Sequence, residues 1–305
     1  TVYSISLVIE LITGLSFFWS VMLLGVMTVV YDVLGGIRAV MYSDVLQMMI
    51  LVSVLLLLFA MLLSSIGGFS ALLTELPPDR LNALNFSGHG LGDGNDFAFW
   101  PMLFGGIFLY VSYYGCDQSQ VQRELCARNV DDANKALLIN GLLRFPLVLL
   151  YCLIGACIAV YATHSPAFIE SLPKNGSTPN YNLAVPLYMI QQLPSGVVGI
   201  GLVALFAAAM SSLDSVINSL SATTMEDFVR RLHRGKVWSD SRELLYSRLL
   251  TAAWGAATLV LAFFVGDIAD TVLVAINKIG SLINGPVLGV FALGILTTRC
   301  NGHGA

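Results

Sequence analysis

Charged residues are scarce in this chain. Asp, Glu, Lys and Arg make up 11% of its 305 residues, whereas hydrophobic residues make up 56%. A water-soluble domain carries about a quarter charged residues, so the composition excludes an ordinary soluble domain. The chain also lacks basic runs with interleaved aromatic residues, and its net charge is only −4. We therefore expect no nucleic-acid partner.

Metal-binding and catalytic patterns are missing as well. The five cysteines are odd in number and show no metal-ligand spacing, so neither a disulfide framework nor a metal centre is expected. The four histidines are scattered through loops and the C-terminal tail. The acidic residues Glu226 and Asp227 adjoin a basic loop, where solvation or pairing with Arg230 and Arg231 accounts for them. These absences predict that the chain is not an enzyme and holds no organic cofactor.

Long apolar stretches are what the chain has instead. A helix needs roughly 18 to 20 apolar residues to cross a bilayer. Stretches that reach this length lie at 15–33, 40–63, 97–114, 136–162, 197–224, 246–265 and 271–296. They predict an all-α polytopic membrane protein with about seven complete transmembrane helices and the lipid bilayer as its surroundings.

Basic residues are distributed unevenly between alternate loops. Most of the 15 Lys and Arg residues fall on one side of the predicted bundle, whereas Arg80 and Lys174 fall on the other. Loops rich in Lys and Arg stay in the cytoplasm, so the long loops near 65–96 and 163–184 are predicted to lie outside. Arg144 and Lys278 fall inside predicted spans, where a charge marks a functional-site hypothesis. For Arg144 the alternative is that its side chain reaches the nearby cytoplasmic surface.

One predicted span is unusually polar. Residues 207–228 read AAAMSSLDSVINSLSATTMEDF. At about 100° per residue, most of its serines fall on one face beside small residues, and its larger aliphatic residues fall on the opposite face. A small hydroxyl face serves close helix packing or supplies oxygens to a hard cation such as Na⁺. The acid Asp214 favours the cation, because packing does not require a carboxyl group.

Three stretches of the chain resemble motifs of the sodium/solute symporter family, and the resemblance is to a bacterial-type member. They are YDVLGGIRAVMYSDVLQ at 31–47, YYGCDQSQVQRELCARNVDDANKA at 113–136, and the polar helix at 207–228. The resemblance implies two inverted five-helix repeats with the leucine-transporter-like architecture, in which discontinuous helices meet substrate and ion near the midplane. It also implies a plasma-membrane location, which in a bacterium is the inner membrane.

The resemblance places this chain from late in the third core helix through the tenth. The chain begins at Thr1 with an apolar stretch too short to span a membrane. We therefore expect residues 1–305 to form a single transmembrane transporter domain that is truncated at both ends and lacks the first core helix, which contributes to both binding sites.

Sodium ligands are carried over from the family motif on the polar helix. The matching positions are the Ala208 carbonyl and the Ser211 and Ser212 hydroxyls. Asp44 matches an acidic residue implicated in sodium release or in a second sodium site, which Ser215 could join. A helix N-cap is an alternative role for Asp44. Asp214 is a possible ion or proton partner, and the family pattern gives it no defined role.

Substrate contacts are implied by the same comparison. Tyr113 matches the aromatic gate below the substrate, and Tyr114 matches its neighbour. Where sugar-transporting members carry a sugar-binding Asn, a Lys and a Gln, this chain carries Tyr110, Arg144 and the pair Asn277 and Lys278. Two basic groups near a cavity favour an anion, because a carboxylate offsets the cost of a buried cation. Internal neutralisation of Arg144 or Lys278 by Asp214 is the rival explanation.

The expected function is sodium-coupled symport of a small organic solute by alternating access, with Na⁺ as the coupling ion. The favoured solute is an anion such as a monocarboxylate, an amino or imino acid, or an acidic sugar. One alternative is proton coupling with Asp214 or Asp44 as the carrier. Another is a membrane sensor domain of the same fold.

Overall fold

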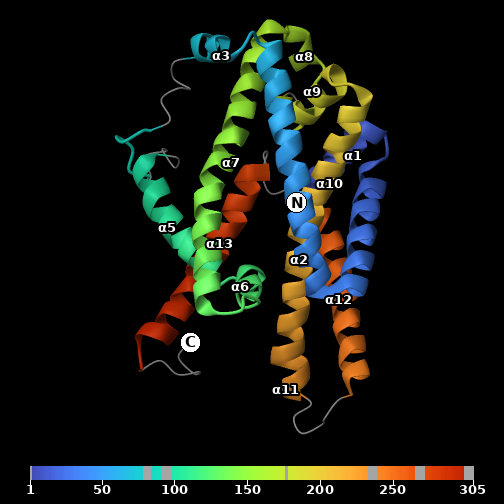
Figure 1. Ribbon diagram of the computed structural model, residues 1–305, viewed down its shortest axis with the longest axis vertical. Coiled ribbons are helices and arrows are strands. Elements are labelled where there is room, and N and C mark those ends of the chain that lie inside the picture. Colours follow the sequence, from blue (N-terminus) through green and yellow to red (C-terminus); the bar gives the residue numbers. More distant parts are fainter. Residues whose placement is uncertain are drawn as a thin grey trace. The chain divides into compact units, whose positions relative to one another are not determined.

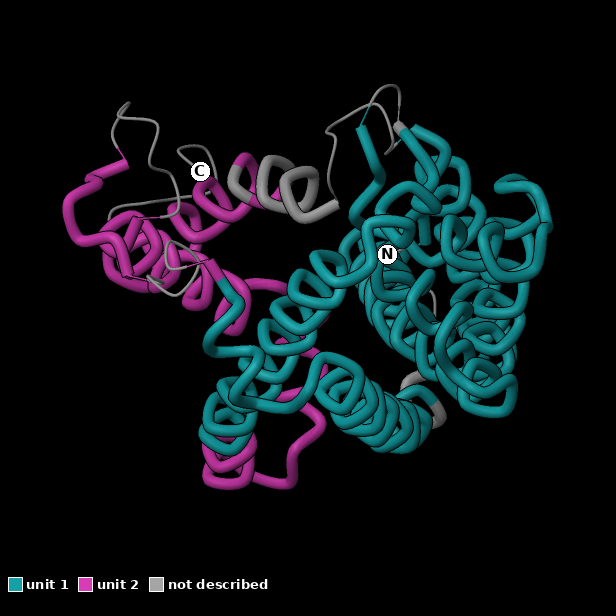
Figure 2. The backbone as a smooth tube through the Cα atoms, turned by 90° about the horizontal axis from the view of Figure 1, so that it is seen from above, with its two compact units in different colours: residues 1–76, 137–269 teal, residues 77–136, 270–305 magenta. Residues whose placement is uncertain are grey.

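The protein is helical almost throughout. A computed structural model describes residues 2–77, 84–90, 98–175, 178–232, 239–264 and 272–298, with the side chains of 37–39, 175, 272–279 and 281 outside the description. The chain divides into two compact units, coloured separately in Figure 2: residues 1–76 with 137–269, and residues 77–136 with 270–305.

The first unit holds most of the helices, and Figure 1 labels its main elements. Its elements are α1 (Val2–Thr13), α2 (Phe17–Ser65), α3 (Phe69–Glu75), most of α7 (Val130–His164), α8 (Pro166–Glu170), β1 (Lys174–Asn175), β2 (Thr178–Pro179), η1 (Tyr181–Leu183), α9 (Ala184–Gln192), α10 (Ser195–Thr223), the π-helical turn η2 (Thr224–Val229), α11 (Arg230–Leu232) and α12 (Asp240–Ala262). The two short antiparallel strands pair within the second long loop, so the all-α prediction holds apart from this hairpin.

The second unit contains α5 (Phe99–Gly115), α6 (Gln118–Glu124), the first turns of α7, and α13 (Val272–Leu296). Within it, α5 packs against α13. The Ser112 hydroxyl on α5 donates a hydrogen bond to the Asn284 carbonyl on α13 at 3.1 Å.

Among the residues that the structure describes, five helical stretches are long and apolar enough to cross a membrane. They are Phe17–Gly36, Val40–Ser65, Val130–His164, Ser195–Leu232 and Asp240–Ala262. The other two predicted spans correspond to α5, which has 17 residues, and to α13, whose assessed apolar part is Leu282–Leu296. The count of seven therefore remains a prediction for these two helices.

The long helix α2 folds back on itself as a helical hairpin. Gly36 has φ +62° and ψ −178°, which breaks the helix between two spans. This left-handed φ suits a residue without a Cβ. The Tyr31 hydroxyl then makes a short hydrogen bond to the Ser43 hydroxyl, although residues twelve apart in a straight helix lie about 18 Å apart. The predicted tight reversal at Gly35-Gly36 is confirmed.

Reciprocal packing joins the first half of α2 to α12. A Cβ on Gly255 would lie 2.3 Å from Val29 Cγ2, and one on Gly25 would lie 1.8 Å from Leu259 Cδ2. Each helix thus provides a glycine notch for a branched side chain of the other, one turn apart. Small residues let membrane helices approach closely. This contact belongs to a core shared by α1, α2, α10 and α12, which includes Val21, Leu24, Leu213 and Ile217 among others.

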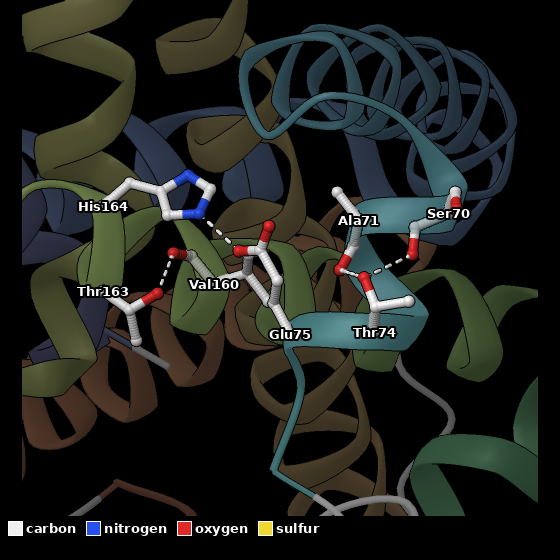
Figure 3. Close-up of polar contacts among 7 residues, drawn as sticks. All are labelled: Ser70, Ala71, Thr74, Glu75, Val160, Thr163 and His164. Atoms are coloured by element: carbon white, nitrogen blue, oxygen red, sulfur yellow. Dashed lines mark hydrogen bonds and ion pairs between the residues drawn. The ribbon is translucent and has the colours of Figure 1, made fainter.

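A polar clasp closes the end of the unit that the charge distribution predicts to lie outside. The His164 imidazole at the end of α7 contacts the Glu75 carboxylate at the end of α3, and Figure 3 shows the two side chains pointing toward each other. In the same view the Thr163 and Thr74 hydroxyls donate to carbonyls of their own helices. Beneath the clasp lies an apolar cluster of α2, α3, α7, α8 and α9 that includes Leu62, Leu72 and Tyr188.

Candidate functional site

The polar helix forms as α10 and carries a ladder of back-bonded serines. The Ser212 hydroxyl donates to the Ala208 carbonyl at 3.2 Å, the Ser215 hydroxyl to Ser211 at 2.7 Å, and the Ser219 hydroxyl to Ser215 at 2.7 Å. Each hydroxyl proton is directed at a carbonyl one turn earlier, so the hydroxyl oxygen keeps lone pairs for another partner. This arrangement is suited to a cation.

The residues of α10 differ in burial. Ser212 is exposed and Ser211 half-buried, whereas Ser215 is buried. Asp214 is fully buried, and its neighbours along the helix, Leu213 and Ile217, lie in the apolar core. Burial does not follow the predicted division into a hydroxyl face and an aliphatic face, because Ser215 and Ser219 are buried whereas Val216 is 43% exposed.

The α2 hairpin brings polar residues against α10, and the two helices pack along each other (Figure 1). The Asn218 amide of α10 donates to Asp32 Oδ1 at 2.8 Å and to the Asp214 carbonyl at 3.0 Å. Asp32 lies on the first half of α2 and is only 2% exposed. One amide therefore links the hairpin to the serine helix.

Asp44 and Asp214 share an electrostatic environment. The carboxyl groups of Asp32, Asp44 and Asp214 lie close enough to the Tyr31 hydroxyl to interact with it electrostatically. Tyr31 in turn contacts Ser43, whose hydroxyl donates to the Val40 carbonyl at 2.8 Å. Two predicted site residues that are far apart in sequence, Asp44 and Asp214, therefore both lie near Tyr31.

Asp44 lies inside the second helical half of α2, which runs as a span over Val40–Ser65. An N-cap precedes the first helical turn, so the N-cap interpretation of Asp44 is wrong. The helix extends back through the residues after Gly36, which leaves this carboxyl group on a helix face instead of at a helix start.

Below the serine ladder, α12 supports α10 through polar contacts. The Ser221 hydroxyl donates to the Ser247 carbonyl at 3.1 Å, the Thr251 hydroxyl lies 3.2 Å from the Ser221 hydroxyl, and Trp254 Nε1 donates to the Thr224 hydroxyl at 2.9 Å. Thr224 begins the π-helical turn η2. These contacts fix the end of α10 that follows the candidate ligands.

The helix end beyond η2 is held by ion pairs. Arg230 contacts Glu226 at 2.5 Å and also pairs with Glu243 of α12, and Arg231 lies 3.7 Å from Asp227. The predicted pairing of Glu226 and Asp227 with Arg230 and Arg231 is confirmed. These acids are solvent-exposed and hold the helix end through ion pairs.

The donor set fits a hard monovalent cation. Hydroxyl and carbonyl oxygens of α10, with a carboxylate nearby, are the ligand types that hard cations take. Among the described residues, no three His, Cys, Asp or Glu side chains converge as metal ligands. Asp32, Asp44 and Asp214 therefore do not form one chelating cluster among the described residues.

The predicted substrate and gate residues belong to other helices. Tyr110, Tyr113 and Tyr114 lie on α5, where Tyr110 stacks on Tyr114 with centroids 6.2 Å apart and Tyr113 meets Tyr114 edge-on at 5.1 Å. Arg144 is exposed on α7. Asn277 and Lys278 lie on α13, and their side chains are outside the described residues.

Asp32 and Asn218 are site residues that sequence reasoning missed. Asp32 falls inside the predicted span 15–33, directly after the tyrosine of YDVLGG. An acid within a span is itself a functional signal. The signal that could have found the pair is this intramembrane charge, together with the amide on the neighbouring polar helix.

The fold and this site define a class: multi-pass membrane proteins of packed helices, with an oxygen-lined polar site within the membrane-spanning part. Ion-coupled transporters belong to this class.

The comparison with known families specifies the class further. Residues 1–305 match the Sodium:solute symporter family, and the chain belongs to this family. The family assignment made from the three motifs is confirmed.

Individual relatives support the family assignment. The sodium-dependent multivitamin transporter of Oryctolagus cuniculus is 28% identical over 319 residues, which cover 99% of this chain and 46% of that protein. The sodium/sialic acid symporter NanT of Aliivibrio fischeri is 29% identical over 299 residues, which cover 93% of this chain and 55% of that protein. Both relatives are transporters, in agreement with the prediction that the chain is not an enzyme.

A solved structure shares the fold. It is described as the substrate-bound outward-open state of a Na⁺-coupled sialic acid symporter with a novel Na⁺ site. It matches with a TM-score of 0.79 at 24% identity, over 99% of this chain and 60% of that chain. The predicted fold class, part of a leucine-transporter-like membrane bundle, is confirmed. The chain spans about half the length of the curated relatives it matches.

Proposed function

We propose that the protein couples the movement of Na⁺ down its gradient to uptake of a small organic solute by alternating access. The back-bonded serine ladder of α10 is the observation that carries this proposal. In it the Ser211 and Ser212 hydroxyls and the Ala208 carbonyl lie within one turn of each other, on the face that is not packed in the core. Family membership supports sodium as the coupling ion.

The ion is held by oxygens of α10, with Asp44 and Ser215 as candidates for a further ion. Asp44 lies near Tyr31, which also lies near Asp214, so negative charge collects around the serine helix. A cation bound there would offset that charge. Sodium would stabilise the helix arrangement in which these oxygens converge, and its release would free α10 to move.

The solute we propose is a small organic anion such as a monocarboxylate, an amino or imino acid, or an acidic sugar. Relatives named as sialic acid and monocarboxylate transporters support an anionic solute. Arg144 and Lys278 supply the positive charge for it in this proposal. The tyrosines of α5, which pack as a ring cluster, are the proposed gate. We place the protein in the plasma membrane.

The test uses the protein expressed from its complete gene and reconstituted in lipid vesicles. Uptake of labelled lactate, proline, sialic acid and glucose is measured with an inward Na⁺ gradient, and again with choline replacing Na⁺ at fixed pH. We expect uptake of an anionic or zwitterionic solute only with Na⁺. Replacing Ser211 and Ser212 together by Ala should raise the half-saturating Na⁺ concentration about tenfold or more, because each lost contact to a charge costs about 1.5–3 kcal/mol.

Ser219→Ala is the matched control. Its hydroxyl donates to the preceding turn as the Ser212 hydroxyl does, but it lies about two turns from Ser211. This variant should keep the wild-type Na⁺ requirement. Unchanged sodium activation in the Ser211 and Ser212 double variant would refute the ligand assignment. Full uptake in choline, driven by a pH gradient, would assign proton coupling instead.

A further inference from the structure

Asp32 is a buried acid that the sodium mechanism does not use. It lies on the first half of α2, it is 2% exposed, and its Oδ1 accepts one hydrogen bond from the Asn218 amide at 2.8 Å. Its Oδ2 is buried and has no hydrogen-bond partner among the described residues. A single neutral amide is therefore the polar support of this carboxyl group in the part of the chain that the structure describes.

Such an environment does not support a free negative charge. An ionised carboxylate removed from water costs far more than a neutral polar group, and a group placed this way takes up a proton instead of staying charged. An ionised carboxylate has two oxygens and about four acceptor sites, whereas this carboxyl group has one donor. The geometry fits the neutral acid, in which one oxygen accepts from Asn218 and the other carries the proton.

The charged groups near Asp32 also favour its neutral form. Asp44, on the second half of α2, is the charged group that acts on Asp32. Asp214 of α10 shares the Tyr31 environment with both acids. Of the other helices packed against α2, α1 carries Tyr3 and Glu10, and α12 carries Asp240, Arg242, Glu243, Tyr246 and Arg248. Among the described residues, none of these groups acts on Asp32 as Asp44 does.

We propose that Asp32 is a proton-binding site of this transporter. The carboxylate takes one proton from water and becomes a neutral carboxylic acid, and the reverse step returns the proton to water. Asp32 lies one turn before Gly36, where the hairpin reverses. The bound proton stabilises the contact between the hairpin and the serine helix, because it removes a negative charge that Asp44 would repel.

Infrared difference spectroscopy tests this directly and does not depend on sodium coupling. The protein expressed from its complete gene is reconstituted in phosphatidylcholine vesicles in Na⁺-free choline buffer and stepped from about pH 5 to about pH 9, the range in which buried carboxyl groups titrate. A protonated carboxyl group has a C=O stretching band that a carboxylate lacks. We expect such a band in the wild type, lost reversibly at high pH, and absent in Asp32→Asn.

Two further variants complete the experiment. Asp240→Asn removes an exposed carboxyl group and should leave the band unchanged. Asn218→Ala removes the amide donor but keeps the acid, so the band should persist at a shifted frequency. This variant also keeps the proposal testable if Asp32→Asn does not fold.

Three results would overturn the proposal. The first is a titrating band that survives in Asp32→Asn. The second is a band that Asn218→Ala leaves at the wild-type frequency. The third is saturable loss of the band on adding Na⁺ at constant pH, which would make Asp32 a sodium ligand instead.

Discussion

At the scale of single residues, the site depends on a few hydrogen bonds that close the α2 hairpin onto α10. The Tyr31–Ser43 contact joins the two halves of the hairpin, and the Asn218–Asp32 contact joins the hairpin to the serine helix. The Tyr31–Ser43 contact connects two segments that meet because the chain reverses at Gly36. The position of Asp44 relative to α10 therefore depends on side chains that bind no ion themselves.

Tyr31→Phe should destabilise this part of the protein modestly. The variant removes the hydroxyl group that meets Ser43 and keeps the ring, so the expected loss is about 0.5–1.5 kcal/mol, as for one hydrogen bond. Thermal unfolding in detergent measures it.

Ser43→Ala and the double variant close a double-mutant cycle with Tyr31→Phe. If the two hydroxyl groups act through each other, the double variant should cost less than the sum of the single variants. Strict additivity of the losses would show that the hydroxyl groups contribute independently and that the contact is not what holds the hairpin.

Residue types predicted part of this site. An apolar run interrupted by serines and Asp214 was enough to predict the polar helix, because an idle carboxyl group is costly in a membrane. The pairing of Asp32 with Asn218 was not predictable, since residues 186 apart in sequence meet only through tertiary packing. The N-cap alternative for Asp44 failed because the pattern alone does not show how closely a helix resumes after a glycine pair.

At the scale of the helices, α2 and α12 are matched by their glycine notches. Val29 fits over Gly255, and Leu259 fits over Gly25. Branched side chains are stiff at χ1, so Val29 has little freedom to move aside. The closeness of the two helices is thus set by the absence of two Cβ atoms.

Gly255→Ala should therefore weaken the α2–α12 contact. The new Cβ would lie 2.3 Å from Val29 Cγ2, and overpacking of this kind costs about 1–3 kcal/mol. The measurement is the midpoint of thermal unfolding in detergent, which should fall.

Gly155→Ala on α7 is the matched control, because nothing lies within 4 Å of its added Cβ. It should leave the midpoint unchanged or raise it, since Ala is the better helix former. Adding Val29→Ala to Gly255→Ala should restore part of the loss. A midpoint equal to that of the wild type in Gly255→Ala would contradict the notch interpretation.

Most helices were predictable at this scale, and their ends were less so. The polar helix was expected to span 197–224, and α10 runs over Ser195–Thr223 before turning into a π-helix. Hydrophobic length predicts where a span lies. It does not predict the π-helical turn, which coincides with the Trp254–Thr224 contact to α12 and so depends on a neighbouring helix.

At the scale of the whole molecule, the candidate ligands of α10 are accessible from outside the first unit. Ser212 is exposed although its neighbour Leu213 is buried. The proposed sodium site is therefore approached from the face of α10 that turns away from the core.

A cysteine at this position should report on sodium. In the protein expressed from its complete gene, with the native cysteines replaced, Ser212→Cys should react with a water-soluble thiol reagent. The reaction should slow about tenfold when Na⁺ is present at about ten times its Kd, because the occupied fraction rises accordingly. The measurement is the rate of labelling in Na⁺ and in choline.

Ser241→Cys provides the comparison for that experiment. Ser241 is exposed at the start of α12, away from the serine ladder, and its labelling should not depend on Na⁺. Equal labelling of Ser212→Cys with and without Na⁺ would speak against ion binding at this face of α10.

The hydrogen bond between the Ser212 hydroxyl and the Ala208 carbonyl bears on the speed of ion capture. The carbonyl accepts this proton at 3.2 Å. Both oxygens keep a lone pair while this bond persists, but an ion that takes the place of the proton at the carbonyl needs the hydroxyl turned to another staggered rotamer. Exposed side chains make such flips in picoseconds to nanoseconds, whereas packed helices rearrange in microseconds to milliseconds. The serine therefore reaches its ion-ready rotamer many times during each helix movement, and the helices set the pace of sodium entry and exit.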